Sequence, residues 1–213
     1  MTSSIVVIDY GMGNLRSVSK AIEHLCPAGY RVVVSDDPAQ IAAAERVVFP
    51  GQGAARDCMA AISDHQLNRA VLEAARSKPF LGICMGLQVL LEFSEENGGT
   101  ALLGLIPGQV RRFPGGVGAQ GERLKIPHMG WSPVQQCRDH PLWAGIPDQA
   151  RFYFVHSYFV DPLERELASG ESDYGTRFVS AIARDNLFAT QFHPEKSADH
   201  GLQLLRNFIT WRP

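Results

Sequence analysis

The sequence predicts an α/β fold built on a mixed sheet, with parallel strands at its centre and antiparallel strands added to them. Two observations carry this prediction. In the first half, short runs of β-branched residues alternate with helical segments, which is typical of parallel strands joined by right-handed crossovers. In the second half, strand-like runs follow one another with only short connections, as antiparallel strands do. A length of 213 residues favours a single domain over residues 1–213.

Four strands are expected in the first half, because each is a short, apolar run rich in β-branched residues. Their ranges are 4–9, 30–35, 46–50 and 79–84. Open α/β sheets bind ligands at the carboxyl ends of their strands, so a site is expected at that edge.

The segments between these strands have helical periodicity. The first helix is expected after Asn14, whose side chain can cap it. Its apolar face repeats at helical spacing and consists of Leu15, Val18, Ile22 and Leu25. Further helices are expected over residues 38–45, over a long run from the loop at 49–54 to about Lys78, and over residues 86–93 before the turn at 97–99.

The second half is expected to contain strands with short connections. Their ranges are 109–113, 132–136, 151–158, 177–184 and 187–192. The sequence Ala-Arg-Asp-Asn-Leu-Phe at 183–188 predicts a hairpin turn, because Asp and Asn tolerate left-handed backbone. Residues 200–211 are expected to close the chain as a helix.

The composition argues against several classes of partner. Hydrophobic residues make up 45% and charged residues 20%, with a formal net charge of -2, which is ordinary for a globular protein. No run of Lys and Arg indicates nucleic-acid binding, and no basic amphipathic stretch indicates a membrane surface. The first strand follows the N-terminus without a signal sequence, and no apolar stretch is long enough to span a bilayer. A cytoplasmic protein is expected.

The cysteines point to one unusual position. The four residues Cys26, Cys58, Cys84 and Cys137 are too widely spaced for a zinc site and are read as cytosolic thiols. No metal and no other cofactor is expected. Cys84 alone lies between two glycines where a predicted strand meets a predicted helix.

The pattern Gly82-x-Cys84-x-Gly86 predicts a nucleophile elbow, a sharp strand-to-helix turn that presents a reactive side chain. Residues two before and two after the nucleophile come close together there, and glycine has no Cβ to clash. The following helix favours the thiolate through its dipole, and the Met85 amide can face an oxyanion. Gln88 lies one helical turn further on the same side. The alternative is a buried cysteine flanked by packing glycines.

A thiol nucleophile needs a base, and the base needs an orienting group. Among the seven histidines, His193 stands out because it ends a predicted strand and precedes Pro194 and Glu195. Residues two apart in extended backbone point the same way, so Glu195 can hold the imidazole as in acyl-transfer triads. The alternative is a strand-end turn with a surface glutamate.

The loop at 49–54 also follows a predicted parallel strand. Its small residues, among them Gly51 and Gly53, let backbone amides approach a ligand closely. Such a loop can supply a second oxyanion donor. The alternative is a glycine-rich turn into a helix with no such role.

A second glycine motif, at 116–121, matches the G-x-G-x-x-G pattern. It follows a proline and leads into charged residues, whereas the dinucleotide fingerprint needs a strand before it and a helix after it. We therefore interpret it as a surface loop.

Together these motifs resemble the class I, triad-type glutamine amidotransferases. The elbow GICMGLQ, the sequence FHPE and the upstream PGQG carry that resemblance. Four further motifs are similar to the glutaminase subunits of imidazole glycerol phosphate synthase; they are DYGMGNLRSV at 9–18, KIPHMGW at 125–131, YFVHSY at 153–158 and QFHPEKS at 191–197. The resemblance covers nearly the whole chain and implies a flavodoxin-like sheet with helices on both faces.

The resemblance implies that Cys84 attacks glutamine to form a thioester, with His193 and Glu195 completing the triad. Ammonia and then glutamate are released. The positions that resemble those holding glutamine and its oxyanion are Gln88, Met85, His156, Ser157, Tyr158 and the loop Gly51, Gln52 and Gly53.

The resemblance also implies a partner, a separate cyclase subunit with a (β/α)8 barrel. Ammonia channelled to it is used to make imidazole glycerol phosphate and an aminoimidazole carboxamide ribonucleotide in histidine biosynthesis. Asn14, Arg16 and Lys196 lie in motifs that resemble the partner-facing edge. As plain residues they are equally well read as a helix cap and solvated charges.

The chain departs from the family pattern at two positions. Gln52 stands where the family usually has valine, and Ser132 where it usually has asparagine. Three alternatives remain open at this point: the glutaminase of another synthase, a stand-alone cysteine hydrolase, and a non-catalytic binding subunit with this fold.

Overall fold

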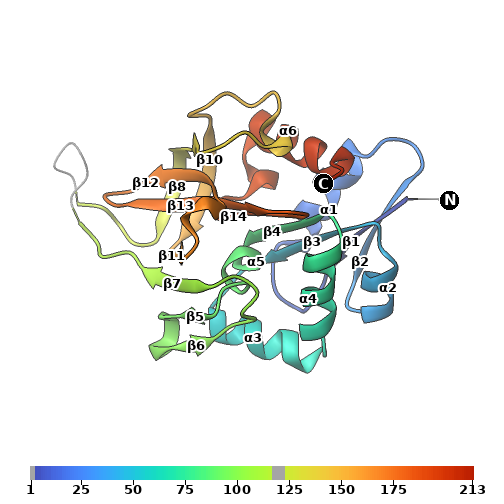
Figure 1. The fold of residues 1–213 in the computed structure, drawn as a ribbon, viewed down its shortest axis with the longest axis horizontal. Helices are drawn as coiled ribbons and strands as arrows, with labels where there is room; N and C mark the ends of the chain where they lie inside the picture. Colours follow the sequence, from blue (N-terminus) through green and yellow to red (C-terminus); the bar gives the residue numbers. More distant parts are fainter. Residues whose placement is uncertain (1–2, 117–122) are drawn as a thin grey trace.

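The computed structural model describes residues 3–116 and 123–213 and contains one large mixed sheet (Figure 1). The first four strands are β1 (Ser3–Ile8), β2 (Tyr30–Ser35), β3 (Arg46–Gly51) and β4 (Phe80–Cys84). They pair in parallel in the order β2-β1-β3-β4, and the later strand β14 (Leu187–Thr190) joins in parallel beside β4. The predicted parallel centre is confirmed, with a C-terminal strand inserted next to the elbow.

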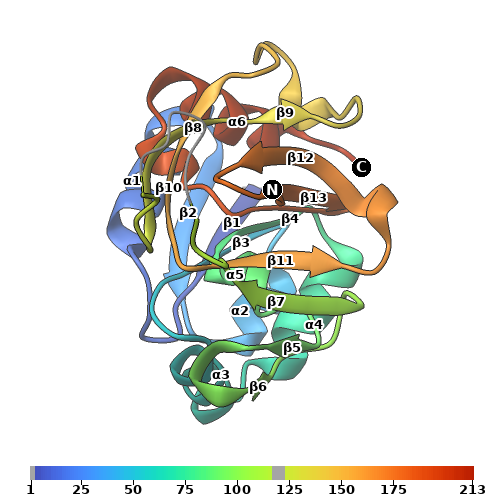
Figure 2. The ribbon, with the colours of Figure 1, turned by 90° about the vertical axis from the view of Figure 1, so that its left-hand side faces the viewer.

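The antiparallel additions lie beyond β14. In order from β14 they are β13 (Arg177–Arg184), β11 (Tyr158–Pro162), β7 (Gly108–Arg112), β5 (Phe93–Ser94) and β6 (Thr100–Ala101), with β5 parallel to β7. Strand β12 (Ala168–Asp173) also pairs with β13, and β9 (Gln135–Gln136) pairs with β12. Figure 2 shows this order running from β12 and β13 down to β5 and β6.

Helices cover both faces of the sheet, as predicted (Figure 1). They are α1 (Leu15–Leu25), α2 (Pro38–Ala43), α3 (Ala55–Asp64), α4 (Asn68–Ser77), α5 (Met85–Gln88) and α6 (Ala198–Thr210). Alternate residues of β1 point to opposite faces. Val6 therefore packs in the cluster of α2, α3 and α4, and Val7 in that of α1 and α6. No helix among the described residues is long and apolar enough to cross a membrane.

The helix predicted over 86–93 is wrong. The helix α5 ends at Gln88, and the chain then enters β5. The carbonyl groups of residues 89–91 accept hydrogen bonds from the backbone amides of residues 103–105 instead of continuing a helix. Residues 89–91 are apolar and buried, and periodicity alone cannot separate a short helix from a packed loop.

The long helix predicted to end near Lys78 is two helices. Gln66 adopts a left-handed φ of 57° between α3 and α4, and the Leu67 amide bonds back to the Ile62 carbonyl. No glycine or proline marks this break in the sequence.

Two predicted strands also need correction. The run at 151–158 divides at Ser157 into β10 (Arg151–His156) and β11. The run at 132–136 is the end of β8 (His128–Pro133) followed by β9. Strand β10 pairs with β8 in a separate two-stranded ladder, whereas β11 belongs to the large sheet. Strands β5, β6 and β12 have no counterpart in the prediction.

Candidate active site

Cys84 lies in a sharp turn between β4 and α5. Its backbone has φ 56° and ψ -108°, a left-handed φ that residues other than glycine rarely adopt. A Cβ atom on Gly82 would lie 2.7 Å from the carbonyl oxygen of Gly86, and one on Gly86 would overlap the carbonyl oxygen of Phe49. The two glycines are therefore required by close backbone approach, which is the local geometry of an elbow.

The helix after Cys84 is short. Four residues of α5 give a smaller dipole than the predicted helix of eight, so the expected support of a thiolate by that dipole is weaker than the sequence indicated. Any stabilisation of a Cys84 thiolate must come from neighbouring side chains and amides.

His193 and Glu195 form a buried pair immediately after β14. The Nδ1 atom of His193 lies 3.0 Å from Oε1 of Glu195, and the two side chains are 2% and 0% exposed. Within the described residues, His193 Nε2 and Glu195 Oε2 have no hydrogen-bond partner of normal geometry. Glu195 therefore fixes Nδ1 of the imidazole as a donor and leaves Nε2 available.

The electrostatics keep the imidazole protonated. Burial alone lowers the pKa of His193, but the neighbouring Cys84 and Glu195 side chains outweigh it and raise the pKa to about 10. At neutral pH the imidazole beside the Cys84 side chain is therefore an imidazolium.

The loop at 51–53 lies beside the elbow. Strands β3 and β4 pair with Gly51 opposite Cys84, and a Cβ on Gly51 would overlap the Tyr10 hydroxyl. The buried Cys58 thiol donates to the Gln52 carbonyl oxygen at 3.3 Å. Burial raises the pKa of Cys58 to about 11, so this donor keeps its proton. The Gln52–Gly53 peptide is thus fixed at its carbonyl oxygen by Cys58.

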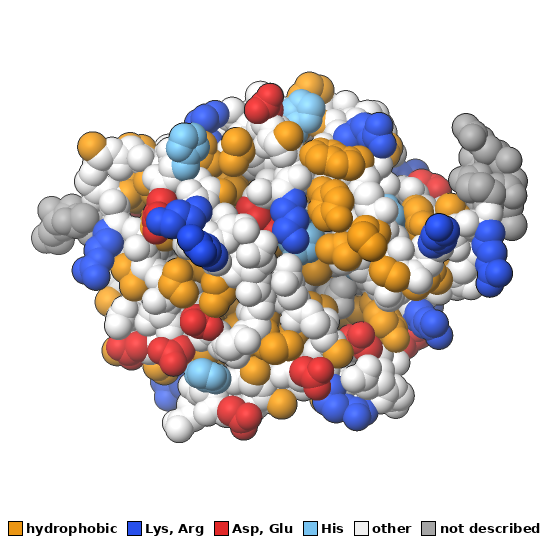
Figure 3. Space-filling view, turned by 180° about the vertical axis from the view of Figure 1, so that it is seen from behind, with side chains coloured by type: hydrophobic (Ala, Val, Ile, Leu, Met, Phe, Trp, Pro, Cys, Tyr) orange, Lys and Arg blue, Asp and Glu red, His pale blue; other side chains and the backbone are white. Residues whose placement is uncertain are grey.

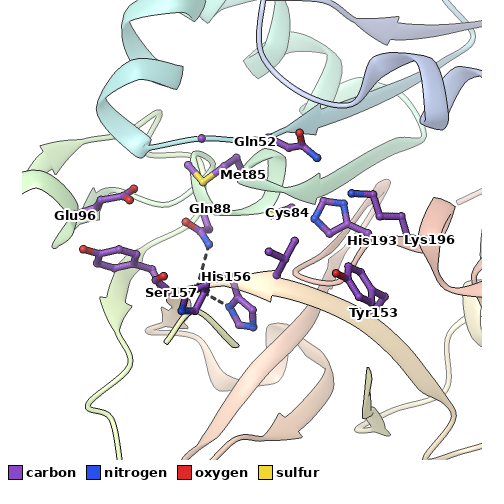
Figure 4. Close-up of a pocket in the computed structure, with 14 residues that line it drawn as sticks. Gln52, Cys84, Met85, Gln88, Glu96, Tyr153, His156, Ser157, His193 and Lys196 are labelled. Carbon is purple, nitrogen blue, oxygen red and sulfur yellow. Dashed lines mark hydrogen bonds between the residues drawn. The ribbon is translucent and has the colours of Figure 1, made fainter. Parts of the chain in front are cut away.

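These elements surround a cavity of about 450 Å³ (Figure 4). Of the predicted site residues, those that line it are Gln52, Gly53, Cys84, Met85, Gln88, His156, Ser157, Tyr158, His193 and Lys196. Gly51 is buried beneath the loop and does not line it. The wall also contains residues that the sequence did not indicate: Glu96, Pro127, Tyr153 and Val155.

A chain of hydrogen bonds runs behind one wall of the cavity. Gln88 Nε2 donates to the Tyr158 carbonyl at 3.2 Å and to Gln191 Oε1 at 2.9 Å, and Gln191 Nε2 lies 3.6 Å from the Cys84 sulfur. Gln191 is not among the site residues predicted from the sequence. It lies two residues before His193, and the period of extended backbone that links His193 to Glu195 also points to it.

The same carbonyl of Tyr158 receives the Nδ1 proton of His156 at 2.8 Å. His156 Nε2 is 2.9 Å from His128 Nδ1, and His128 Nε2 is 2.9 Å from the hydroxyl of Ser132. Burial lowers the pKa of His156 to about 3 and that of His128 to about 4. His156 is therefore a neutral, hydrogen-bonded residue of the wall, and Ser132 ends its network.

The three residues predicted at a partner-facing edge occupy different surroundings. Asn14 stands at the N-cap position of α1, but its side chain makes no capping hydrogen bond. It lines a narrow gap with Gln52 and the His193–Glu195 pair. Arg16 is exposed, and Lys196 lies in the cavity wall. Their role toward a partner stays a prediction.

The glycine motif at 116–121 falls, apart from Gly116, outside the described residues. Among the residues that are described, no group of three or more His, Cys, Asp or Glu side chains has the arrangement of a metal site.

A strained cysteine elbow facing a buried His–Glu pair, on a mixed α/β sheet, defines a cysteine-dependent amide or ester hydrolase. The family model for glutamine amidotransferase class-I matches residues 6–211, and the chain belongs to that family. Within it, the chain is similar over its whole length to subunits of one synthase. "Imidazole glycerol phosphate synthase subunit HisH" of Aromatoleum aromaticum is 62% identical over 99% of this chain and 100% of that protein.

Other comparisons agree. The HisH subunit of Thiobacillus denitrificans is 60% identical over 100% of this chain and 93% of that protein. Among solved structures, PurLQS from Thermotoga maritima has a TM-score of 0.70 at 17% identity, covering 98% of both chains. Similarity at that identity concerns the fold, and it supports the predicted class I amidotransferase-like sheet.

Proposed function

We propose that this chain is the glutaminase of imidazole glycerol phosphate synthase, which hydrolyses glutamine and passes the ammonia to a separate cyclase subunit. The observation that carries the proposal is the Cys84 elbow opening into a cavity that also contains the buried His193–Glu195 pair. The sequence identity to HisH subunits gives the synthase.

The charges of the cavity wall favour a free amino acid over a peptide. Glu96 and Lys196 carry opposite charges and line the same cavity of about 450 Å³. A free glutamine has one α-ammonium and one α-carboxylate, whereas an internal residue of a peptide has neither. This match weighs against the stand-alone peptidase among the alternatives.

In the proposed reaction, the Cys84 thiolate attacks the carboxamide carbon of glutamine. Backbone amides of Met85 and of the Gln52–Gly53 loop stabilise the oxyanion; one such donor is typically worth ~100-fold in rate. The protonated His193 gives its Nε2 proton to the departing nitrogen, and the C–N bond breaks to release ammonia. The neutral imidazole then takes a proton from water, whose oxygen attacks the thioester and releases glutamate. Glu195 holds the imidazole throughout.

A partner follows from the product and from the surface. Ammonia that reaches water is protonated and loses its nucleophilicity, so a synthase must receive it directly. Met129 and Trp131 on β8 are 63% and 42% exposed, which is unusual for large apolar side chains next to a ligand cavity. Figure 3 shows hydrophobic side chains gathered near the middle of one face of the molecule. The proposed occupant is a cyclase subunit with a (β/α)8 barrel, with Asn14, Arg16 and Lys196 at the junction.

The test measures glutamate released from glutamine by the chain alone, and by the chain with its cyclase partner and the ribonucleotide ligand. We expect slow release alone, a large rise in the complex, and no release from Cys84→Ser in either. Full turnover without any response to the cyclase would assign the chain to another synthase or to an autonomous glutaminase. Release by the Cys84→Ser variant would remove Cys84 from the reaction.

A further inference from the structure

Gln191 is a buried side chain that the proposed reaction does not use. It lies between β14 and His193, it is 0% exposed, and its backbone amide donates to the Ser180 carbonyl at 2.8 Å. A buried carboxamide must find partners for its donors and its acceptor. The partners of Gln191 are the nucleophile Cys84 and the substrate-wall residue Gln88.

The orientation of both carboxamides follows from one backbone carbonyl. The oxygen of Tyr158 can only accept, so Gln88 must turn its NH2 group toward it at 3.2 Å. The second proton of that NH2 group points to Gln191, which must therefore present its oxygen, at 2.9 Å. This leaves the NH2 group of Gln191 facing the sulfur of Cys84, at 3.6 Å. The donor direction along the chain is fixed at each step.

This direction has one consequence at each end. At Cys84, an N–H donor faces the sulfur, and a donor to an anion is stronger than one to a neutral group. At Gln88, both amide protons are used, so the group left for a ligand is the acceptor Oε1. Figure 4 draws the Gln88 oxygen on the side away from its hydrogen bond to the Tyr158 carbonyl.

We propose that Gln191 is a positioning residue of the glutaminase site. Its amide nitrogen holds the Cys84 sulfur, and its amide oxygen holds Gln88 so that Oε1 of Gln88 accepts a hydrogen bond from the substrate. The inference rests on the proposed function, since glutamine supplies the N–H donor that Gln88 Oε1 receives.

Two variants of nearly the same length test the nitrogen and the oxygen of Gln191. Gln191→Met removes both polar atoms, and Gln191→Glu keeps the acceptor while placing an anion beside the sulfur. The control is Gln136→Leu, which removes a partly buried carboxamide that donates to the Ile146 carbonyl outside the cavity. Near-ultraviolet circular dichroism checks that each variant is folded.

The first measurement is the rate of Cys84 alkylation by iodoacetamide against pH, read on the Cys84 peptide by mass spectrometry. Apart from the carboxylate that Gln191→Glu introduces, the titratable groups around the sulfur are the same in every protein compared; they are His193, Glu195, Lys196, Glu96, Tyr10 and Cys58. We expect the midpoint to rise by about one pH unit in Gln191→Met and by more in Gln191→Glu, since hydrogen bonds to charged groups are worth about tenfold or more. Gln136→Leu should follow the wild type.

The second measurement is glutaminase kinetics in the complex with the cyclase subunit. We expect the KM for glutamine to rise roughly tenfold in Gln191→Met, because Gln88 loses one of the two hydrogen bonds that hold it. Unchanged alkylation midpoints together with unchanged KM in both variants would overturn the proposal. Alkylation does not depend on the substrate, so a shifted midpoint without any glutamate release would count against the glutaminase function and leave the contact to Cys84 standing.

A third measurement needs no variant. The side-chain amide of Gln191 in the wild-type chain should shift in NMR spectra when Cys84 is alkylated, whereas that of Gln136 should not. If the Gln191 resonance is unaffected, the nitrogen of Gln191 does not face the sulfur and the proposal is wrong.

Discussion

At the scale of single residues, the site depends on the absence of a Cβ atom at two glycines as well as on its reactive side chains. Gly82 and Gly86 let three backbone segments meet around Cys84, and Cys84 itself carries the left-handed φ that the turn imposes. The reactive pair is then completed by a carboxylate 3.0 Å from the imidazole. Both features predict the outcome of small substitutions.

Gly86→Ala should destabilise the fold far more than an ordinary glycine substitution. Its Cβ would overlap the Phe49 carbonyl, so strand β3 would have to move, at a cost of about 4 kcal/mol or more. The control Gly29→Ala pays only for a left-handed φ of 94° in open space, roughly 1–2 kcal/mol. Urea unfolding measures both. Equal losses in the two variants would contradict the close approach at the elbow.

Glu195→Gln should lower kcat in the complex by about 100-fold or more while KM stays within a few-fold, because an amide no longer stabilises the imidazolium. The substitution also removes the Glu195 charge that helps to raise the pKa of His193, so this pKa should fall from about 10. The control is Glu73→Gln, which removes the carboxylate of an exposed ion pair with Arg69. Steady-state glutamate release and an NMR titration of His193 check the two parts, and wild-type kcat in the Glu195 variant would exclude an orienting role.

At the scale of elements, the β8–β10 ladder carries a pair of neutral histidines. His128 and His156 bond to each other and are anchored at one end by Ser132 and at the other by the Tyr158 carbonyl. The pKa values of about 4 and about 3 mean that both stay uncharged well below the ordinary value of 6.5. Proton uptake must therefore oppose folding.

The free energy of unfolding should decrease as pH falls from 6.5 toward 4. In that window the unfolded chain binds protons that the folded histidines refuse, so the loss is up to about 1.4 kcal/mol per pH unit for each histidine. His140, whose pKa is lowered to about 4 by burial, adds to it. His193 acts in a different pH window. Its raised pKa stabilises the folded chain fully below pH 6.5, and this stabilisation is lost as the pH rises from 6.5 toward about 10.

Urea unfolding at several pH values tests this. His128→Gln should flatten the acid limb relative to the wild type, whereas the exposed His24→Gln should not. An identical slope in both variants would show that the buried pair does not carry the effect.

At the scale of the whole molecule, the chain combines a buried reactive centre with an apolar outer surface on β8. Trp131 is 42% exposed and packs edge-on against Tyr153, a residue of the cavity wall. Side chains of this size usually gain a partner when they are exposed beside a functional cavity.

Trp131→Ala should weaken the complex with the proposed cyclase subunit by about tenfold or more and leave the unfolding free energy within about 0.5 kcal/mol. The control is Leu163→Ala, which is 74% exposed but outside the cavity wall. Calorimetric titration of the partner measures both. Equal affinities for wild type and Trp131→Ala would move the interface away from β8.

Much of this arrangement was predictable from local patterns. The parallel strands followed from β-branched runs, the elbow from paired glycines, and the His193–Glu195 contact from the period of extended backbone. The early end of α5 was not predictable, because carbonyl groups 89–91 find partners in the distant segment 103–105. Nor was the division at Ser157, where one apolar run joins two different sheets. The role of Gln191 was not predictable either, because it follows from a tertiary contact to Cys84.

The cavity lies between two sheets that share no strand pairing among the residues that the structure describes. The nucleophile stands on the large sheet at β4, and part of the opposite wall, including Tyr153 and Val155, stands on the small ladder at β10. Natural variation can therefore act on the two halves separately. Outward residues of the ladder such as Met129 and Trp131 are exposed and can change, whereas a Cβ on Gly82 or Gly86 would clash with the backbone around Cys84. Such a division would let the ladder adapt to a different second subunit while the turn that presents Cys84 stays the same.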